Sequence, residues 1–188
     1  MKIGLYFGSF NPIHVGHLII AQTLFQRGGL DQVWFVVSPQ NPLKRQESLA
    51  HEHDRLRMVE LAIEDNFDFR AVDVEFRMPK PSYTIDTLTL LSEKHPQHQF
   101  SIFLGSDNLS HFHKWKNYKA ILEHYPILVY PRPGEVKTLE HPGVNYLDAP
   151  LLDISATFIR QSIQDGLSVR YLLPERVEQY ILAKKLYE

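Results

Sequence analysis

The sequence predicts an α/β fold: a Rossmann-like, doubly wound and mostly parallel sheet with helices on both faces. Apolar runs of strand length alternate along the chain with segments whose apolar residues recur at helical spacing, which is the serial order of parallel α/β folds. The run at 33–37 is β-branched and aromatic without polar alternation, as is typical of a strand covered on both faces. The length of 188 residues suits one domain, so we expect residues 1–188 to form a single domain.

The first half of the chain is predicted to hold three strands, each followed by a helix. In order, these are a strand at 2–7, a helix carrying Leu18, Ala21, Leu24 and Phe25, a strand at 33–37, a helix carrying Leu56, Val59 and Ile63, a strand at 71–74, and a helix carrying Ile85, Leu88 and Leu91. Ser82 or Thr84 is the expected cap of the third helix, because a hydroxyl can satisfy the N–H groups of a first turn.

The second half continues the alternation. It is predicted to hold a strand at 100–104, a helical segment ending at Glu123, strands at 127–130 and 144–147, a helix from Ser155 to about Asp165, and a C-terminal helix with Pro174 as its first residue. In a sheet of this kind, ligands bind at the carboxyl ends of the strands. The loops that follow the strands are therefore where functional residues are expected.

Charge and composition exclude several classes of function. Twenty Lys and Arg residues stand against 22 Asp and Glu, for a formal net charge of −2, so no bulk positive field is present to bind a nucleic acid. The lack of cysteine excludes a disulfide scaffold, a zinc ribbon and a thiol nucleophile. The apolar run at 3–7 is too short for a signal peptide or a membrane span. We therefore expect a soluble, cytoplasmic protein with no nucleic-acid or membrane partner.

The first functional motif lies between the first strand and the first helix. It reads Gly8-Ser9-Phe10-Asn11-Pro12-Ile13-His14-Val15-Gly16-His17. The glycine that opens it allows a tight turn close to a ligand, and the first helical turn offers unpaired N–H groups and a partial positive charge to an anion. His14 and His17 are three residues apart, so both imidazoles can donate to one phosphate, and Gly16 is expected to leave room for the ligand.

Two other interpretations of this motif remain open. Asn11 could be a helix cap, with His14 and His17 as ordinary polar residues of a helix start. The two histidines could also belong to a metal site, for which further ligands would have to come from elsewhere in the chain. The candidates for those ligands are the pairs His51-x-His53 and His111-x-His113.

A second anion-suited helix start lies far downstream. In Ile154-Ser155-Ala156-Thr157-Phe158-Ile159-Arg160, Ser155 and Thr157 offer hydroxyls and Arg160 offers a fork of donors that matches a phosphate. The alternative is a capped surface helix with an exposed arginine. Two phosphate-suited helix starts in one small domain favour a polyphosphate ligand.

Both motifs resemble signatures of one superfamily. The first is similar to the G-x-F-x-P-x-H-x-G-H signature of the nucleotidyltransferase superfamily of adenylyl- and cytidylyltransferases, and the second to its I-S-x-T-x-I-R motif. Within that superfamily, the chain resembles the nicotinate-mononucleotide adenylyltransferases, the bacterial enzymes of NAD synthesis, over nearly its whole length. The segments that carry this closer likeness are Ser82-Tyr83-Thr84-Ile85-Asp86-Thr87-Leu88, Gly105-Ser106-Asp107-Asn108 and the series Leu109, Phe112, Trp115, Tyr118.

The resemblance implies a reaction and a set of site residues. The substrates would be ATP, with Mg²⁺ bridging its phosphate oxygens, and nicotinate mononucleotide; the products would be nicotinate adenine dinucleotide and pyrophosphate. The implied catalytic residues are His14, His17 and Arg160, and the implied ATP site is formed by Gly8, Ser9, Phe10, His14, Gly16, His17, Lys44, Gly105, Asp107, Ser155, Thr157 and Arg160. The implied acceptor site is formed by Tyr83, Thr84, Trp115 and Arg132, and no residue is assigned as a metal ligand.

The implied roles in the acceptor site are specific. Trp115 would stack on the pyridine ring, and the backbone N–H groups of Tyr83 and Thr84 would bind the ring's carboxylate. A helix N-terminus at Thr84 favours an anion, which is a physical reason to expect nicotinate rather than nicotinamide. Asp107 would contact the ribose or the adenine of ATP. Phe112 is expected in the core, whereas Trp115, between Lys114 and Lys116, is expected to be partly exposed.

Some positions depart from the family pattern. Pro42-Leu43 precedes Lys44 where the family often has Pro-His, so Lys44 is either a phosphate ligand or a solvated loop lysine. Arg132 resembles a family position near the acceptor phosphate, and its alternative is a loop charge. Tyr118 stands where a second tryptophan is common, which weakens its assignment to the acceptor site.

Other functions compete with this one. A related transferase could use nicotinamide mononucleotide or pantetheine phosphate as its acceptor, and a non-catalytic regulator could bind nucleotide without turnover. The tetrapeptide His14-Val15-Gly16-His17 is also similar to a motif of class I aminoacyl-tRNA synthetases, but 188 residues with an acidic balance leave no tRNA-binding domain. The sequence leaves room for a homo-oligomer.

Overall fold

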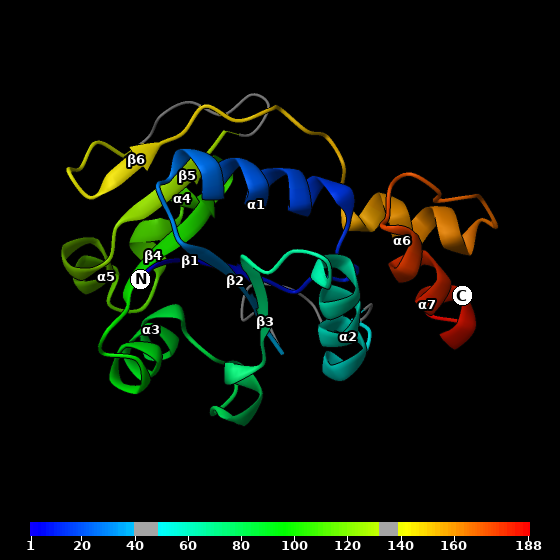
Figure 1. The fold of residues 1–188 in the computed structure, drawn as a ribbon, viewed down its shortest axis with the longest axis horizontal. Helices are drawn as coiled ribbons and strands as arrows, with labels where there is room; N and C mark the ends of the chain where they lie inside the picture. The colour runs from blue at the N-terminus through cyan, green and yellow to red at the C-terminus, as the bar shows by residue number, and fades with distance from the viewer. Residues whose placement is uncertain (40–48, 132–138) are drawn as a thin grey trace.

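A six-stranded parallel sheet is the centre of the fold. The structure is a computed structural model that describes residues 1–39, 49–131 and 139–188. The strands lie in the order β3-β2-β1-β4-β5-β6, and every neighbouring pair is parallel (Figure 1). Their bounds are β1 (Lys2–Gly8), β2 (Gln32–Val37), β3 (Phe69–Val72), β4 (Gln99–Gly105), β5 (Ile127–Tyr130) and β6 (Val144–Tyr146). The order reverses between β1 and β4, so ligands are expected beyond the carboxyl ends of these two strands.

The two faces of the sheet are covered by separate apolar clusters. Ile3 and Leu5 of β1 belong to one cluster and Tyr6 to the other, because successive side chains of a strand point to opposite faces. Trp34 and Phe35 of β2 divide in the same way. Burial on both faces explains why these strands show no polar alternation in the sequence.

Helices cover both faces, as predicted. One cluster takes in residues of α1 (Val15–Arg27), α2 (Glu52–Ile63), α6 (Ala156–Gln164) and α7 (Glu175–Lys184). The other takes in residues of α3 (Thr84–Lys94), α4 (Ser106–Leu109), the 3₁₀ helix η2 (Phe112–Lys114) and α5 (Tyr118–His124) (Figure 1). A second 3₁₀ helix, η1 (Val74–Arg77), links β3 to the segment before α3.

Several element boundaries differ from the predictions, and Pro174 is the N-cap of α7 rather than its first residue. The strand expected at 71–74 lies at Phe69–Val72, because its pairing with β2 ends at Val72 and the chain then turns into η1. The helical segment expected up to Glu123 is divided into α4, η2 and α5. The expected cap of α3 is wrong: Tyr83 occupies the N-cap position, and no side chain in the described parts of the chain caps this helix.

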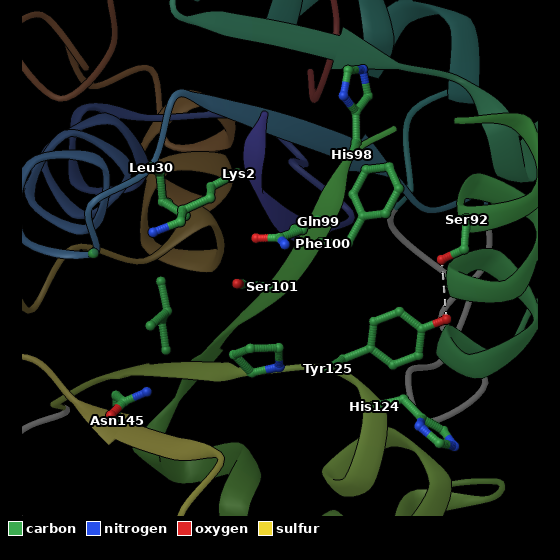
Figure 2. A pocket seen from close by; sticks show the side chains of 13 residues that line it. Lys2, Leu30, Ser92, His98, Gln99, Phe100, Ser101, His124, Tyr125 and Asn145 are labelled. Atoms are coloured by element: carbon green, nitrogen blue, oxygen red, sulfur yellow. Dashed lines mark hydrogen bonds between the residues drawn. The ribbon is translucent and has the colours of Figure 1, made fainter. Parts of the chain in front are cut away.

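A cavity of about 580 Å³ lies at the amino ends of the strands, at the opposite edge of the sheet from the carboxyl ends. It is lined by residues at the starts of β1 and β4, among them Lys2 and Gln99, and by Asn145 of β6 (Figure 2). It contains none of the residues that the sequence marks as functional. Within the described residues, no helix is both long and apolar enough to cross a membrane.

Candidate active site

The loop between β1 and α1 is shaped by an aromatic side chain that turns inward. Phe10 has a φ of 45°, and its ring is only 1% exposed. The ring packs edge-on against Tyr6, with centroids 5.6 Å apart, and a Cβ on Gly8 would meet it at 2.7 Å. Gly8 is therefore required by the inward Phe10. The Phe10 ring belongs to the core, and the assignment of Phe10 to the ATP site stays a prediction.

The two histidines of the motif are stacked on each other. Their ring centroids are 3.7 Å apart with 27° between the planes. The backbone N–H of His14 donates to Nδ1 of His17 at 3.2 Å, so Nε2 carries the hydrogen when the His17 ring is neutral. His14 is buried and His17 is half-buried, with its ring against Phe10. The predicted common face of the two imidazoles is confirmed.

Gly16 makes room for a side chain of the protein itself. A Cβ at this position would lie 3.0 Å from Nδ1 of His14 and 3.5 Å from Cβ of Ile154. The space that the sequence analysis left for the ligand is thus taken by the His14 ring and by the second motif. Gly16 thus allows the His14 ring to pack closely, and its assignment to the ATP site stays a prediction.

Arg160 joins the two motifs. Its Nη1 donates to the backbone carbonyl of Asn11 at 2.8 Å, across 149 residues of sequence, and its Nη2 donates to Oγ1 of Thr157 at 3.4 Å. Ser155 caps α6, since its Oγ accepts the N–H of Phe158 at 3.2 Å. Ser155 and Thr157 are exposed and Arg160 is half-buried. Arg160 is therefore not the exposed arginine of the alternative interpretation, although α6 is a capped helix.

Asn11 anchors the motif to two other parts of the chain. Its Oδ1 accepts the N–H of Ala50 at 3.0 Å and the hydroxyl of Tyr187 at 2.8 Å. The N-cap of α1 is His14, so the alternative in which Asn11 caps this helix is wrong. Burial raises the pKa of the Tyr187 hydroxyl, which keeps it a donor at neutral pH. Neither contact of Asn11 was visible in the sequence, because the partners are remote.

Replacing Tyr187 with phenylalanine is expected to loosen this anchor. The variant loses the buried hydrogen bond from the Tyr187 hydroxyl to Oδ1 of Asn11 but keeps the one from the N–H of Ala50. The loss should lower the free energy of unfolding by about 1 kcal/mol. For a chain of this size, the melting temperature should fall by about 2–4 °C. Thermal unfolding followed by circular dichroism measures the change. Tyr171→Phe is the matched control, because Tyr171 is 80% exposed, and an equal fall in both variants would contradict the role of the Asn11 contact.

Arg55 of α2 is a buried cation that the sequence analysis missed. It is 1% exposed and donates to four backbone carbonyls, those of Ser9 at 2.6 Å, Ser38 at 2.7 Å, Ala50 at 2.9 Å and Pro39 at 3.0 Å. Burial lowers the pKa of the guanidinium from its usual range. The carbonyls of Ser9 and Ser38 follow β1 and β2 directly, so Arg55 ties together the loops that leave the carboxyl ends of these strands. One signal could have found it: Arg55 precedes Met58 and Val59 at helical spacing, on the buried stripe of α2.

The loop after β4 begins at the same edge of the sheet as the loop after β1. Gly105 ends β4, and a Cβ there would meet the carboxylate of Asp107 and the ring of Tyr130. Asp107 is exposed in the short helix α4. Because β1 and β4 are neighbours in the sheet, Gly105 and Asp107 lie at the same edge as Gly8. This is the placement that the sequence analysis expected.

Three of the residues assigned to the acceptor, Tyr83, Thr84 and Trp115, come from two adjacent segments. Lys116 lies with its Nζ 4.9 Å from the centroid of the Tyr83 ring and 2.8 Å from Oδ2 of Asp86, so the segment of Trp115 lies beside the start of α3. Trp115 is half-buried and packs against Phe112, with centroids 5.2 Å apart. Phe112 is 1% exposed, which confirms its place in the core.

The positions of Lys44 and Arg132 and the alternative of a metal site at His14 and His17 are still to be considered. Lys44 and Arg132 lie outside the residues that the structure describes. Among the described residues, no group of three side chains of the metal-ligating kinds comes together, so no such cluster includes His14 and His17. The donors present at the site are imidazoles, hydroxyls, a guanidinium and backbone amides, which suit phosphate oxygens.

Comparison with known proteins agrees with this geometry. The model of the family described as cytidylyltransferase-like matches residues 5–162. Probable nicotinate-nucleotide adenylyltransferases of Cytophaga hutchinsonii and Flavobacterium johnsoniae are 56% and 50% identical to the chain, over all of it and over 98% and 100% of their own lengths. The Plasmodium falciparum nicotinic acid mononucleotide adenylyltransferase complexed with NaAD superposes with a TM-score of 0.83 at 20% identity, over 99% of this chain and 97% of that one, and so has the same fold. The chain belongs to the cytidylyltransferase-like family and, within it, to the nicotinate-nucleotide adenylyltransferases.

Proposed function

We propose that the chain transfers the adenylyl group of ATP to nicotinate mononucleotide, giving nicotinate adenine dinucleotide and pyrophosphate in NAD biosynthesis. The observation that carries this proposal is the contact of Arg160 with the carbonyl of Asn11, which brings the two phosphate-suited helix starts to one place. The names of the relatives and the NaAD bound in the Plasmodium falciparum structure support the choice of acceptor.

The reaction is a substitution at the α-phosphorus of ATP. An oxygen of the acceptor's 5′-phosphate forms the new P–O bond, and the bond from the α-phosphorus to the bridging oxygen breaks, so that pyrophosphate leaves with that electron pair. A phosphate dianion is already a nucleophile, so the protein has to align the reactants and neutralise charge. His14 and His17 would stabilise the charge that develops on the α-phosphate, and Arg160 and Lys44 would stabilise the leaving pyrophosphate.

The remaining ATP contacts would come from the loops after β1 and β4 and from the start of α6. Gly8 and Ser9 offer backbone groups beyond β1, Ser155 and Thr157 offer donors at the start of α6, and Gly105 and Asp107 face the ribose or adenine from beyond β4. Mg²⁺ would enter with ATP as part of the substrate and would neutralise part of the phosphate charge.

The acceptor would bind between α3 and the segment of Trp115. The N–H groups of Tyr83 and Thr84 would donate hydrogen bonds to the nicotinate carboxylate, and the Trp115 indole would stack on the pyridine ring. Stacking on an aromatic platform contributes about 1–3 kcal/mol per base in nucleic-acid complexes. Arg132 would bind the acceptor phosphate.

The setting of the reaction is part of the proposal. Residues 1–188 would act as a single nucleotidyltransferase domain in the cytoplasm, on small-molecule substrates and without a nucleic acid or a membrane. A homo-oligomer is compatible with this function.

Comparing acceptors in a pyrophosphate-coupled assay tests the proposal. With ATP present, nicotinate mononucleotide should release pyrophosphate with a kcat/KM at least about tenfold above that of nicotinamide mononucleotide, because the start of α3 favours an anion. Release with pantetheine phosphate alone would make the chain a transferase with another acceptor. Absence of release with all three acceptors would leave the nucleotide-binding regulator as the function.

A further inference from the structure

Glu75 is a buried carboxylate that the proposed mechanism does not use. It lies in η1 and is 3% exposed. Oε2 accepts the hydroxyl of Ser82 at 2.7 Å, and Oε1 accepts the hydroxyl of Thr87 at 2.8 Å. Ser82 is 8% exposed and Thr87 is fully buried. Both oxygens of the carboxylate therefore have a donor, in a place that water hardly reaches.

These two hydroxyls stand on either side of the first turn of α3. Ser82 directly precedes Tyr83, the N-cap, and Thr87 closes the turn by donating its N–H to the Tyr83 carbonyl at 3.2 Å. One carboxylate thus holds the residue before the helix and the residue that completes its first turn. The backbone between them is the part of α3 assigned to the acceptor.

The hydrogen bond to Glu75 also bears on the capping of α3. Serine is a preferred capping residue, yet no side chain in the described residues caps α3, whereas Ser155 caps α6. A hydroxyl that donates to a carboxylate forms a strong, charge-assisted hydrogen bond and keeps its orientation. The Ser82 hydroxyl thus donates to Glu75, and the first turn of α3 has no side-chain cap among the described residues.

We propose that Glu75 is a positioning residue of the acceptor site: through Ser82 and Thr87, it holds the first-turn N–H groups of α3 uncapped and in place for the anionic group of the acceptor. This inference rests on the proposed function. Glu75 does not touch the acceptor. It acts on the backbone of Tyr83 and Thr84, and hence on acceptor affinity and on the preference for an acid over an amide.

Steady-state kinetics of three variants test this role. Glu75→Gln keeps the shape of the side chain but loses the charge; Thr87→Val keeps the shape of threonine but loses the hydroxyl. Both should raise the KM for nicotinate mononucleotide about tenfold and leave the KM for ATP within about twofold, because a charge-assisted hydrogen bond is lost on the acceptor side alone. Thr87→Ser, which retains the hydroxyl, should stay close to the wild type.

Selectivity gives a readout that a merely structural role would not change. The ratio of kcat/KM for nicotinate mononucleotide to that for nicotinamide mononucleotide should fall in Glu75→Gln and Thr87→Val and persist in Thr87→Ser. An equal rise of both KM values, or a lower melting temperature with unchanged KM values and unchanged selectivity, would overturn the inference. If Glu75→Gln does not fold, the two Thr87 variants decide the matter.

Pyrophosphate release by the wild-type protein distinguishes a failure of this inference from a failure of the proposed function. Pyrophosphate release from nicotinate mononucleotide by the wild type, together with an unchanged acceptor KM in the variants, overturns the role of Glu75 alone. Absence of release by the wild type overturns the proposed function, and the inference falls with it.

Discussion

Replacing His17 with alanine is expected to lower kcat by about 10²–10³, the loss typical of removing one donor to a developing negative charge. The His17 ring stacks on His14 at 3.7 Å and lies at the opening of α1, where the α-phosphate would bind. The variant also loses the acceptor of the His14 N–H, which should cost about 1 kcal/mol of stability, as for a lost helix cap. The pyrophosphate-coupled assay at saturating substrates measures kcat.

Two further variants separate the loss of catalysis from the loss of stability and provide a control. His17→Asn retains an acceptor for the His14 N–H, so it should recover most of the stability while its kcat stays low. His124→Ala changes a histidine whose side chain is 63% exposed on α5, and should leave kcat unchanged. Full turnover by a folded His17→Ala protein would remove the imidazole from the proposed mechanism.

Arg55→Met is expected to give the largest loss of stability. The change removes a buried guanidinium that donates to four carbonyls, and leaves those carbonyls without their donor. Removing one side of a buried charged interaction costs roughly 3–5 kcal/mol. For a chain of this length, the melting temperature should fall by about 10 °C. We also expect a higher KM for ATP, because the carbonyl of Ser9 loses its anchor.

Arg57→Met is the matched control on the same helix. Arg57 pairs with Glu60 at 3.0 Å on the surface, with its side chain 53% exposed, and an exposed pair of this kind contributes less than about 1 kcal/mol. Its melting temperature should change by less than about 4 °C. Similar losses in the two methionine variants would contradict the view that Arg55 fastens the loops after β1 and β2.

Much of the fold could be predicted because its pattern is local. The buried strands β1 and β2 are apolar on both faces, and the helical spacing of Leu88 and Leu91 already marks the buried side of α3. The end of β3 could not be predicted in the same way, because its last residue is set by its pairing with β2. Strand pairing is a contact across the chain, and a local pattern does not contain it.

In the candidate site, too, local features could be predicted and contacts between remote residues could not. The common face of His14 and His17 follows from a spacing of three residues and was predicted. Arg55, Glu75 and Tyr187 were missed, because each acts through partners that only the folded chain brings near. Gly16 shows an intermediate case: the sequence indicates that a small residue is needed there, but only the fold shows that the space belongs to the His14 ring.

The contact between Asn11 and Tyr187 has a consequence for the timing of activity during protein synthesis. The two residues are 176 positions apart. A ribosome adds roughly 5–20 residues per second, so Tyr187 follows Asn11 by about 10–35 s. Throughout that interval, a nascent chain can pair its early strands while the first loop still lacks its last anchor. The loop after β1 can therefore gain its contact with Tyr187 only after that residue has been synthesised.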